Sequence, residues 1–166
     1  MKLLAILIAF GACALAGLRL SQRLQSRATL LGSLREDLRV LLAAVAVSRK
    51  PFSVLVAERQ SLRHGAWFGE YCELRKTLSA DAAWQALWRE RAASYDSLNA
   101  EEQGAVREML AAFTTCDCEA IARRGDELLG FLDGQTKAAG TEFAAKGRIY
   151  RSIGLLLGAA LAVVML

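Results

Sequence analysis

The sequence has 166 residues, of which 54% are hydrophobic and one is a proline, and its formal charge is +4. This length leaves room for one soluble domain beside the apolar ends, since domains cluster near ~100–150 residues. This composition has few residues that would stop helices or close hairpins, so it predicts an all-α protein. The helical patterns and basic flanks described below predict a cytosolic bundle of about six helices.

The N-terminal run is the first predicted element. It is uncharged from Leu3 to Leu18 and, with Leu20, approaches the ~20 residues that a membrane-spanning helix needs. We therefore expect an N-terminal transmembrane helix over residues 1–20. A cleaved signal peptide is the alternative, because Lys2 gives a basic start and Ala14-Leu15-Ala16 satisfies the small-residue cleavage rule.

An amphipathic helix follows from Leu24, with leucines at three- and four-residue steps and no stop signal before Ser48. It is therefore expected to continue from the membrane segment, and Pro51 to lie in the first turn of a second helix that ends at Arg63. His64-Gly65 breaks that helix. His64 is the only histidine, so it is the only histidine base available to a Cys-His or Ser-His-Asp site. We expect a loop or surface role for it.

Two aromatic stripes at helical spacing come next. They consist of Trp67, Tyr71, Leu74 and Leu78, and then of Trp84, Leu87 and Trp88. An aromatic stripe of this kind favours a buried core over a nucleobase-stacking platform, which would need a basic surround that this region lacks.

The last two predicted helices begin at Asn99 and near Asp117. Asn99-Ala100-Glu101-Glu102 has the cap residue and the acid three positions later that mark a helix start. Its buried face is expected to hold Val106, Met109, Leu110 and Phe113. The final helix is expected to turn Ile121, Leu128, Leu129 and Leu132 inward, to be interrupted around Gly134 and Gly140, and to resume through Phe143.

The C-terminal segment, residues 149–166, is the second predicted transmembrane helix. Its uninterrupted apolar part from Ile153 rises only about 21 Å, so the span depends on Tyr150 and Arg151 lying at the interface. A re-entrant or core-buried helix stays open. Small residues at four-residue steps predict close packing of a second helix, although such residues are also common in membrane helices; they are Gly154, Gly158 and Ala162.

Basic residues flank the inner side of both apolar ends. They are Arg19, Arg23, Arg27, Lys146, Arg148 and Arg151. Because such charges stay in the cytoplasm, we expect residues 21–148 to form the cytosolic domain and both termini to lie across the membrane. Acidic residues outnumber basic ones between these flanks, which argues against nucleic acid as a partner.

Chemical motifs are scarce. The sequence has no glycine-rich phosphate loop, metalloprotease motif or nucleophile elbow, so we expect no catalytic residue, no cofactor and no small-molecule substrate. Cys116 and Cys118, with Cys72 and His64, make an incomplete zinc ligand set, and we expect no metal site. The cysteines also form no disulfide framework, which favours free thiols in a reducing compartment.

Nearly the whole chain resembles the stage III sporulation protein AB family. The similarity is closest at Arg148-Ile149-Tyr150-Arg151-Ser152-Ile153-Gly154 and the apolar residues that follow. The leucine series of the first soluble helix, with Pro51 ten residues beyond Leu41, and the pair Ala83-Trp84 are also similar to that family.

This resemblance implies a structural subunit of a secretion-like channel complex between mother cell and forespore. Its cytosolic bundle would be like that of the platform protein of type II secretion and type IV pilus machines. The implied partners are the membrane on the mother-cell side, a secretion-type ATPase and other channel subunits, and homo-oligomerisation stays open. The alternative from a different class is an exported or membrane-tethered helical protein-binding module with a cleaved signal peptide.

Overall fold

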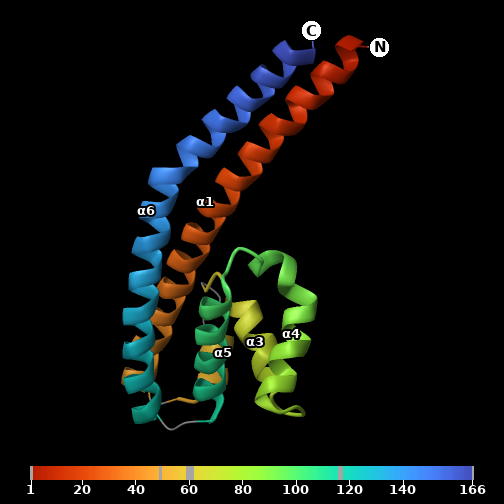
Figure 1. Cartoon of the computed structure of the whole chain (residues 1–166). Coiled ribbons are helices and arrows are strands. Elements are labelled where there is room, and N and C mark those ends of the chain that lie inside the picture. The colour runs from red at the N-terminus through yellow and green to blue at the C-terminus, as the bar shows by residue number, and fades with distance from the viewer. Residues whose placement is uncertain (1, 49, 59–61, 116–117, 166) are drawn as a thin grey trace. The chain divides into compact units, whose positions relative to one another are not determined.

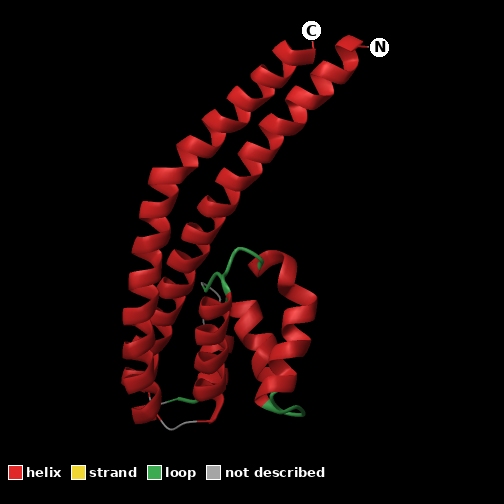
Figure 2. Ribbon diagram, in the orientation of Figure 1, coloured by secondary structure: helices red, strands yellow, loops and turns green. Residues whose placement is uncertain are grey.

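The computed structural model describes residues 2–48, 50–58, 62–115 and 118–165, with the side chains of all of these except 2–5, 7, 9, 115, 118, 162, 164 and 165. Within these ranges the chain forms six helices and no strand (Figure 2), which confirms the all-α prediction. The helices are α1 (Lys2–Ser48), α2 (Phe52–Glu58), α3 (Gly65–Leu74), α4 (Ala80–Tyr95), α5 (Ala100–Thr115) and α6 (Cys118–Met165).

Helix α1 is continuous from the apolar N-terminal run through the amphipathic segment, as predicted. Pro51 lies immediately before α2, where its carbonyl accepts hydrogen bonds from the amides of Val54 and Leu55. The prediction that this second helix reaches Arg63 is wrong, because Arg63 and His64 form a turn. Residues 59–61 lie outside the described part of the chain.

Helix α6 runs without interruption through Gly134 and Gly140, so the predicted break there is wrong. A glycine inside a helix costs only about 1 kcal/mol relative to alanine, and neighbouring buried residues offset it. Leu132 and Ala139 are among those neighbours, at 1% and 2% exposed.

Contacts between residues divide the chain into two compact units. We call residues 1–29 with 136–166 the helix pair, and residues 30–135 the bundle. Helices α1 and α6 contribute to both units. This division separates packing units, and the membrane boundaries expected at residues 20 and 149 stay predictions.

The bundle has a dense apolar core. Helix α3 packs against α2, α4 and α5 (Figure 1), and its Trp67, Phe68 and Tyr71 are at most 2% exposed. The Trp67 ring stacks on Tyr95 of α4 at a centroid distance of 4.2 Å. The prediction that the aromatic stripes form core is thus confirmed for Trp67 and Trp84, whereas Leu78 lies beyond the end of α3 and is 37% exposed.

The caps of α4 and α5 explain where these helices begin. The Ser79 hydroxyl accepts from the amide of Ala82 at the start of α4. At the start of α5, Asn99 Oδ1 accepts from the Glu102 amide, and Glu102 Oε2 accepts from the Asn99 amide, each at 2.8 Å. This reciprocal capping box confirms the helix start predicted from the sequence.

Candidate functional site: the helix pair and the polar contacts of the bundle

The two segments of the helix pair run side by side with both termini at the same end (Figure 1). Their backbones approach closely at three glycines. A Cβ atom on Gly17 would lie 2.5 Å from the Tyr150 carbonyl oxygen, and one on Gly154 would lie 2.9 Å from the Cys13 carbonyl oxygen. A Cβ on Gly158 would lie 2.8 Å from the Phe10 ring. Only glycine permits such a contact.

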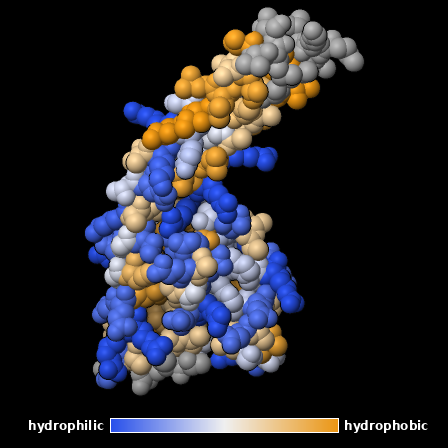
Figure 3. All heavy atoms as spheres, in the orientation of Figure 1, coloured by the Kyte–Doolittle hydropathy of each residue, from blue (hydrophilic) through white to orange (hydrophobic). Residues whose placement is uncertain are grey.

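The helix pair buries small residues and exposes large ones. Every residue of this unit that the structure describes as buried is glycine, alanine or serine: Gly17, Ser21, Ala139, Gly147, Gly154 and Gly158. Of the 15 large hydrophobic side chains exposed among the described residues, 12 belong to the helix pair. Leu156 and Val163 are 68% and 74% exposed, and hydrophobic residues predominate on the visible face of the upper part of this unit, with hydrophilic residues beside and below them (Figure 3).

Polar contacts continue the pairing away from the glycines. Arg151 Nε donates to the Ser21 hydroxyl at 2.9 Å. Arg27 pairs with Glu142 at 3.1 Å, and Lys146 donates to the same carboxylate at 2.9 Å. The Lys146 hydrogen bond and the two positive charges lower the pKa of Glu142, and Glu142 in turn raises the pKa of Lys146. These contacts fix the register of the antiparallel helices.

The helix pair is strongly basic. It contains eight basic residues and one acidic residue, a formal charge of +7, against −3 for the bundle. Among the six predicted flanking residues, Arg27 is half-buried. The other five are exposed: Arg19, Arg23, Lys146, Arg148 and Arg151. Arg19 and Arg148 make no ion pair with any residue whose side chain is described.

The predicted packing residues are placed as follows. Gly154 and Gly158 both lie in the contact with α1. The Ala162 side chain lies outside the described residues. Gly17 was missed by the sequence analysis, although it stands in the same small-residue-rich run as Ala12 and Ala16.

No single described helix is both long and apolar enough to cross a membrane alone, whereas one bent pair, Phe10–Ser48 with Phe52–Glu58, meets these two criteria together. The predicted terminal transmembrane helices therefore stay predictions.

A second polar arrangement lies inside the bundle, around Asp37, and was not predicted from the sequence. Asp37 lies between the leucines of the amphipathic pattern of α1, yet it is only 6% exposed. Its two carboxylate oxygens accept from the amides of Arg63 and His64, at 3.2 and 2.7 Å. A carboxylate facing backbone amides just before α3 also suits the positive end of that helix. Asp37 thus ties α1 to the turn before α3.

His64 lies in the predicted turn, but it is half-buried and bonded through both ring nitrogens. Nε2 lies 2.9 Å from the Ser33 hydroxyl, and Nδ1 lies 3.0 Å from the Tyr95 hydroxyl. The Ser33 hydroxyl donates to the carbonyl of Leu30, so it accepts from Nε2–H and leaves Nδ1 to accept from Tyr95. This network fits the neutral Nε2–H form of the imidazole.

The pKa shifts agree with that network. Burial lowers the pKa of His64, an effect opposed by Asp37 and reinforced by Arg63. Burial also raises the pKa of Tyr95 to about 12, so its hydroxyl keeps the proton that it donates. Ser33 and Asp37 stand four residues apart and so share one face of α1, but this spacing does not by itself indicate that they contact the turn before α3.

Among the described residues, the cysteines do not form a cluster of metal-ligating side chains. Cys72 is buried, and this burial raises the pKa of its thiol to about 11. His64 has both nitrogens engaged by Ser33 and Tyr95. Residue 116 and the side chain of Cys118 lie outside the described part of the chain.

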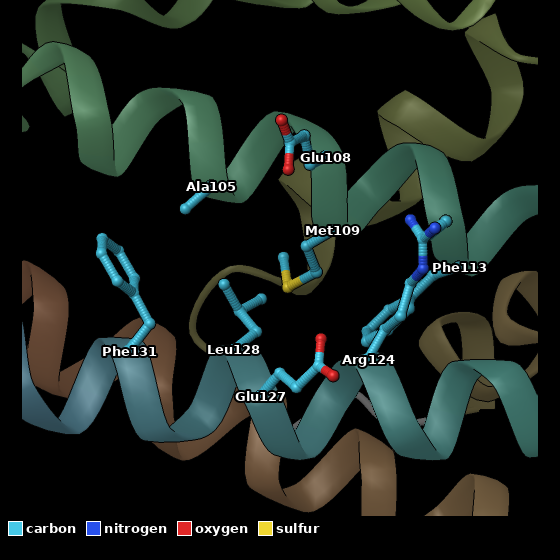
Figure 4. A pocket seen from close by; sticks show the side chains of 9 residues that line it. Ala105, Glu108, Met109, Phe113, Arg124, Glu127, Leu128 and Phe131 are labelled. Atoms are coloured by element: carbon cyan, nitrogen blue, oxygen red, sulfur yellow. The ribbon is translucent and has the colours of Figure 1, made fainter.

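A surface groove of about 410 Å³ lies between α5 and α6 in the bundle (Figure 4). Its floor is apolar, with Met109 and Phe113 from α5 and Leu128 and Phe131 from α6. Its charged lining residues, Glu108, Glu127 and Arg124, are exposed and make no ion pair with any residue whose side chain is described. The groove therefore combines an apolar floor with unneutralised charges.

Comparison with known proteins gives one family. No curated protein and no solved structure matches the chain. The family model described as stage III sporulation protein AB matches residues 2–166, which is essentially the whole chain. The chain therefore belongs to the stage III sporulation protein AB family, which implies a role in sporulation.

Proposed function

We propose that this protein is a non-enzymatic structural subunit of a secretion-like channel complex between mother cell and forespore. In this proposal the apolar ends of the helix pair, residues 1–20 and 149–166, are inserted in the cell membrane of the mother cell. Residues 21–148, which include the bundle, lie in the cytoplasm, and the bundle acts as a rigid docking platform. The mechanism is mechanical: membrane-anchored helices hold the bundle where a secretion-type ATPase and other channel subunits reach it.

The observation that carries the proposal is the inverted packing of the helix pair. Its contact surface is made of small residues, and its large hydrophobic side chains point outward, with Ile8 and Leu15 more than 60% exposed. In water such a surface would be costly, at about 25 cal/mol for each Å² of apolar area. In lipid the same surface costs nothing, and small residues are what membrane helices use to pack.

The basic residues supply the orientation. Positive charges beside apolar segments stay on the cytoplasmic side, and the six flanking residues lie inward of both apolar ends. This orientation puts both termini on the far side of the membrane and the bundle in the cytoplasm. It also fits the common end at which the termini of the helix pair lie.

We further propose that the groove between α5 and α6 receives an amphipathic helix of another channel subunit. The apolar floor suits the apolar face of such a helix. The carboxylates of Glu108 and Glu127 have no ionic partner among the described residues and would pair with basic residues beside that face. The partner is thus expected to present an apolar stripe bordered by lysine or arginine.

Orientation is tested by labelling a single exposed cysteine. Cys72 is unsuited, because it is buried and its thiol pKa is about 11. We would replace all four native cysteines by alanine and introduce Ser94→Cys on the exposed surface of α4. A maleimide that cannot cross membranes should label it only after the cells are permeabilised. Labelling in intact cells would instead support the exported module.

The intact mass of the protein separates the same alternatives independently. Cleavage after Ala16 would remove Phe10 and Cys13, which pack against Gly158 and Gly154. We expect residues 2–16 to be present in the protein from membranes, and resistance of that protein to extraction at alkaline pH. A mature chain that begins at Gly17 would overturn the proposal.

Partner binding is tested by co-purification in a detergent that keeps the other channel subunits together. The variant Glu108→Arg with Glu127→Arg should lose the ATPase or its neighbouring subunit. The control, Glu36→Arg with Glu90→Arg, makes the same charge change at exposed positions of α1 and α4 and should retain it. If the unsubstituted protein never retains a channel subunit, the platform function is wrong.

A further inference from the structure

A hollow of about 460 Å³ lies on α6 within the helix pair, next to the basic residues. It is lined by Phe143, Ala144, Gly147, Arg148 and Arg151. Gly147 lets the Phe143 ring lie close against the backbone of α6, because a Cβ atom at this position would lie 2.9 Å from the ring. The lining of the hollow thus includes an aromatic ring and two guanidinium groups.

The two arginines are available to an anion. Arg151 is held in place by its Nε hydrogen bond to Ser21, which is fully buried. The Arg151 side chain makes no other hydrogen bond and no ion pair with a residue whose side chain is described. Arg148 makes no ion pair with any residue whose side chain is described. Glu142, the only acid of the helix pair, is already bonded to Arg27 and Lys146.

The same face of α6 becomes apolar toward the C-terminus. Ala144, Arg148, Arg151 and Leu155 follow one another at steps of three and four residues, so they lie along one face. Leu155 is 53% exposed and stands about 10 Å along the axis from Arg148, at 1.5 Å per residue. An anionic group followed by an apolar chain would match this order of side chains.

We propose that this hollow binds the phosphate of an anionic phospholipid, with one acyl chain lying along the exposed face that includes Leu155. Guanidinium groups bind phosphate oxygens through paired N–H donors. Basic pockets on the cytoplasmic side of membrane helices bind lipid headgroups in this way. The assignment rests on the proposed membrane insertion of the helix pair, and it adds selectivity among lipids, which insertion by itself does not require.

The test uses the full-length protein in nanodiscs assembled from equal amounts of phosphatidylglycerol and phosphatidylcholine. After extraction with detergent, the lipids that remain bound are quantified by mass spectrometry. The protein should retain phosphatidylglycerol in preference to phosphatidylcholine by about five-fold for each arginine, on the scale of about 1 kcal/mol per basic residue. Arg148→Gln with Arg151→Gln should abolish this preference.

The matched control is Arg39→Gln with Arg123→Gln, which removes two exposed arginines from the bundle. It should keep the lipid preference. Equal retention of both lipids by the unsubstituted protein, or an unchanged preference in the Arg148 and Arg151 variant, would overturn the proposal. Loss of bound phosphatidylglycerol on addition of inorganic phosphate alone would assign the hollow to free phosphate instead.

Resistance to alkaline extraction is measured for the same variants in isolated membranes, so that two failures can be separated. A variant that remains in the membrane but loses lipid selectivity supports the proposed site. A protein that is extracted from membranes at alkaline pH would contradict the membrane insertion on which the site depends.

Discussion

The helix pair and the bundle use hydrophobic side chains in opposite ways. In the bundle, large side chains such as Trp67 and Leu110 are buried, and only three large hydrophobic residues among the described ones are exposed. In the helix pair, the buried residues are small, and the large hydrophobic residues that are exposed are leucine, isoleucine, valine and phenylalanine. One unit has the pattern of a protein in water and the other has the pattern of helices in lipid.

The charges differ in the same sense. The bundle carries a formal charge of −3 and the helix pair one of +7. The small net charge of the whole chain is therefore the sum of two units of opposite charge. Separating the units therefore explains the basic pI without a nucleic-acid partner. In the proposed function, each unit is complementary to a different surrounding: the basic helix pair to anionic headgroups, and the groove of the bundle, with its two glutamates, to a basic protein segment.

The same leucine substitution in both units tests this comparison most strongly. Leu110→Ala should lower the free energy of unfolding by about 2–5 kcal/mol, because Leu110 is fully buried. Leu156→Ala should change it by less than about 0.5 kcal/mol, because Leu156 is 68% exposed. Urea unfolding in detergent, followed by circular dichroism, measures both. Equal losses would remove the distinction between the units.

Glycine substitutions in the helix pair give the next largest effect. Gly17→Ala should cost about 1–3 kcal/mol, because its Cβ would lie 2.5 Å from a backbone carbonyl that has no freedom to rotate away. A Cβ atom on Gly11 would have no neighbour within 4 Å, so Gly11→Ala should be neutral or stabilising, because alanine is the better helix former. Thermal unfolding in detergent compares the two. A matching fall in Tm for Gly11→Ala would show that helix contact is not the cause.

Loss of the cap of α5 should have a smaller effect, confined to the bundle. Asn99→Ala removes the acceptor for the buried Glu102 amide and should cost about 1 kcal/mol. Asn99→Ser restores a cap of the same kind and should recover most of that loss. Urea unfolding monitored by tryptophan fluorescence reports on the bundle, since all three tryptophans lie there. The prediction fails if serine and alanine destabilise equally.

The smallest predicted effect is the pH dependence of the bundle through His64. Its pKa is lower in the folded protein than the ordinary value of 6.5, so the unfolded chain binds the proton more tightly. Stability from neutral His64 is therefore fully present above about pH 6.5 and is lost as the pH falls from there through the lowered pKa. Denaturation midpoints at pH 7.5 and 5.5 measure it.

His64→Gln is the control for that pH effect. Glutamine keeps a donor and an acceptor near Ser33 and Tyr95 but does not titrate, so its stability should change less between these two pH values. Because His64 is the only histidine, few other groups titrate in this range. An identical pH dependence in the variant would assign the effect to the carboxylates.

The sequence by itself determined the class of fold and most helix starts. The leucine steps of α1 and the Asn99 and Glu102 box are local signals, and local hydrogen bonds and burial patterns decide them. The extent of the helices was less certain. The glycines at 134 and 140 suggested a break that α6 does not have, and α2 ends at Glu58 although no stop signal precedes His64.

The tertiary structure alone decided which distant residues meet. Nothing local in the sequence says that Gly17 faces Gly154 or that Asp37 turns inward to the amides of Arg63 and His64. Such contacts join residues far apart in the chain, and their energy depends on how whole helices pack. Basic flanks and small-residue steps were visible in the sequence because composition and spacing encode them, whereas the helix contact and the buried polar network exist only once the chain has folded.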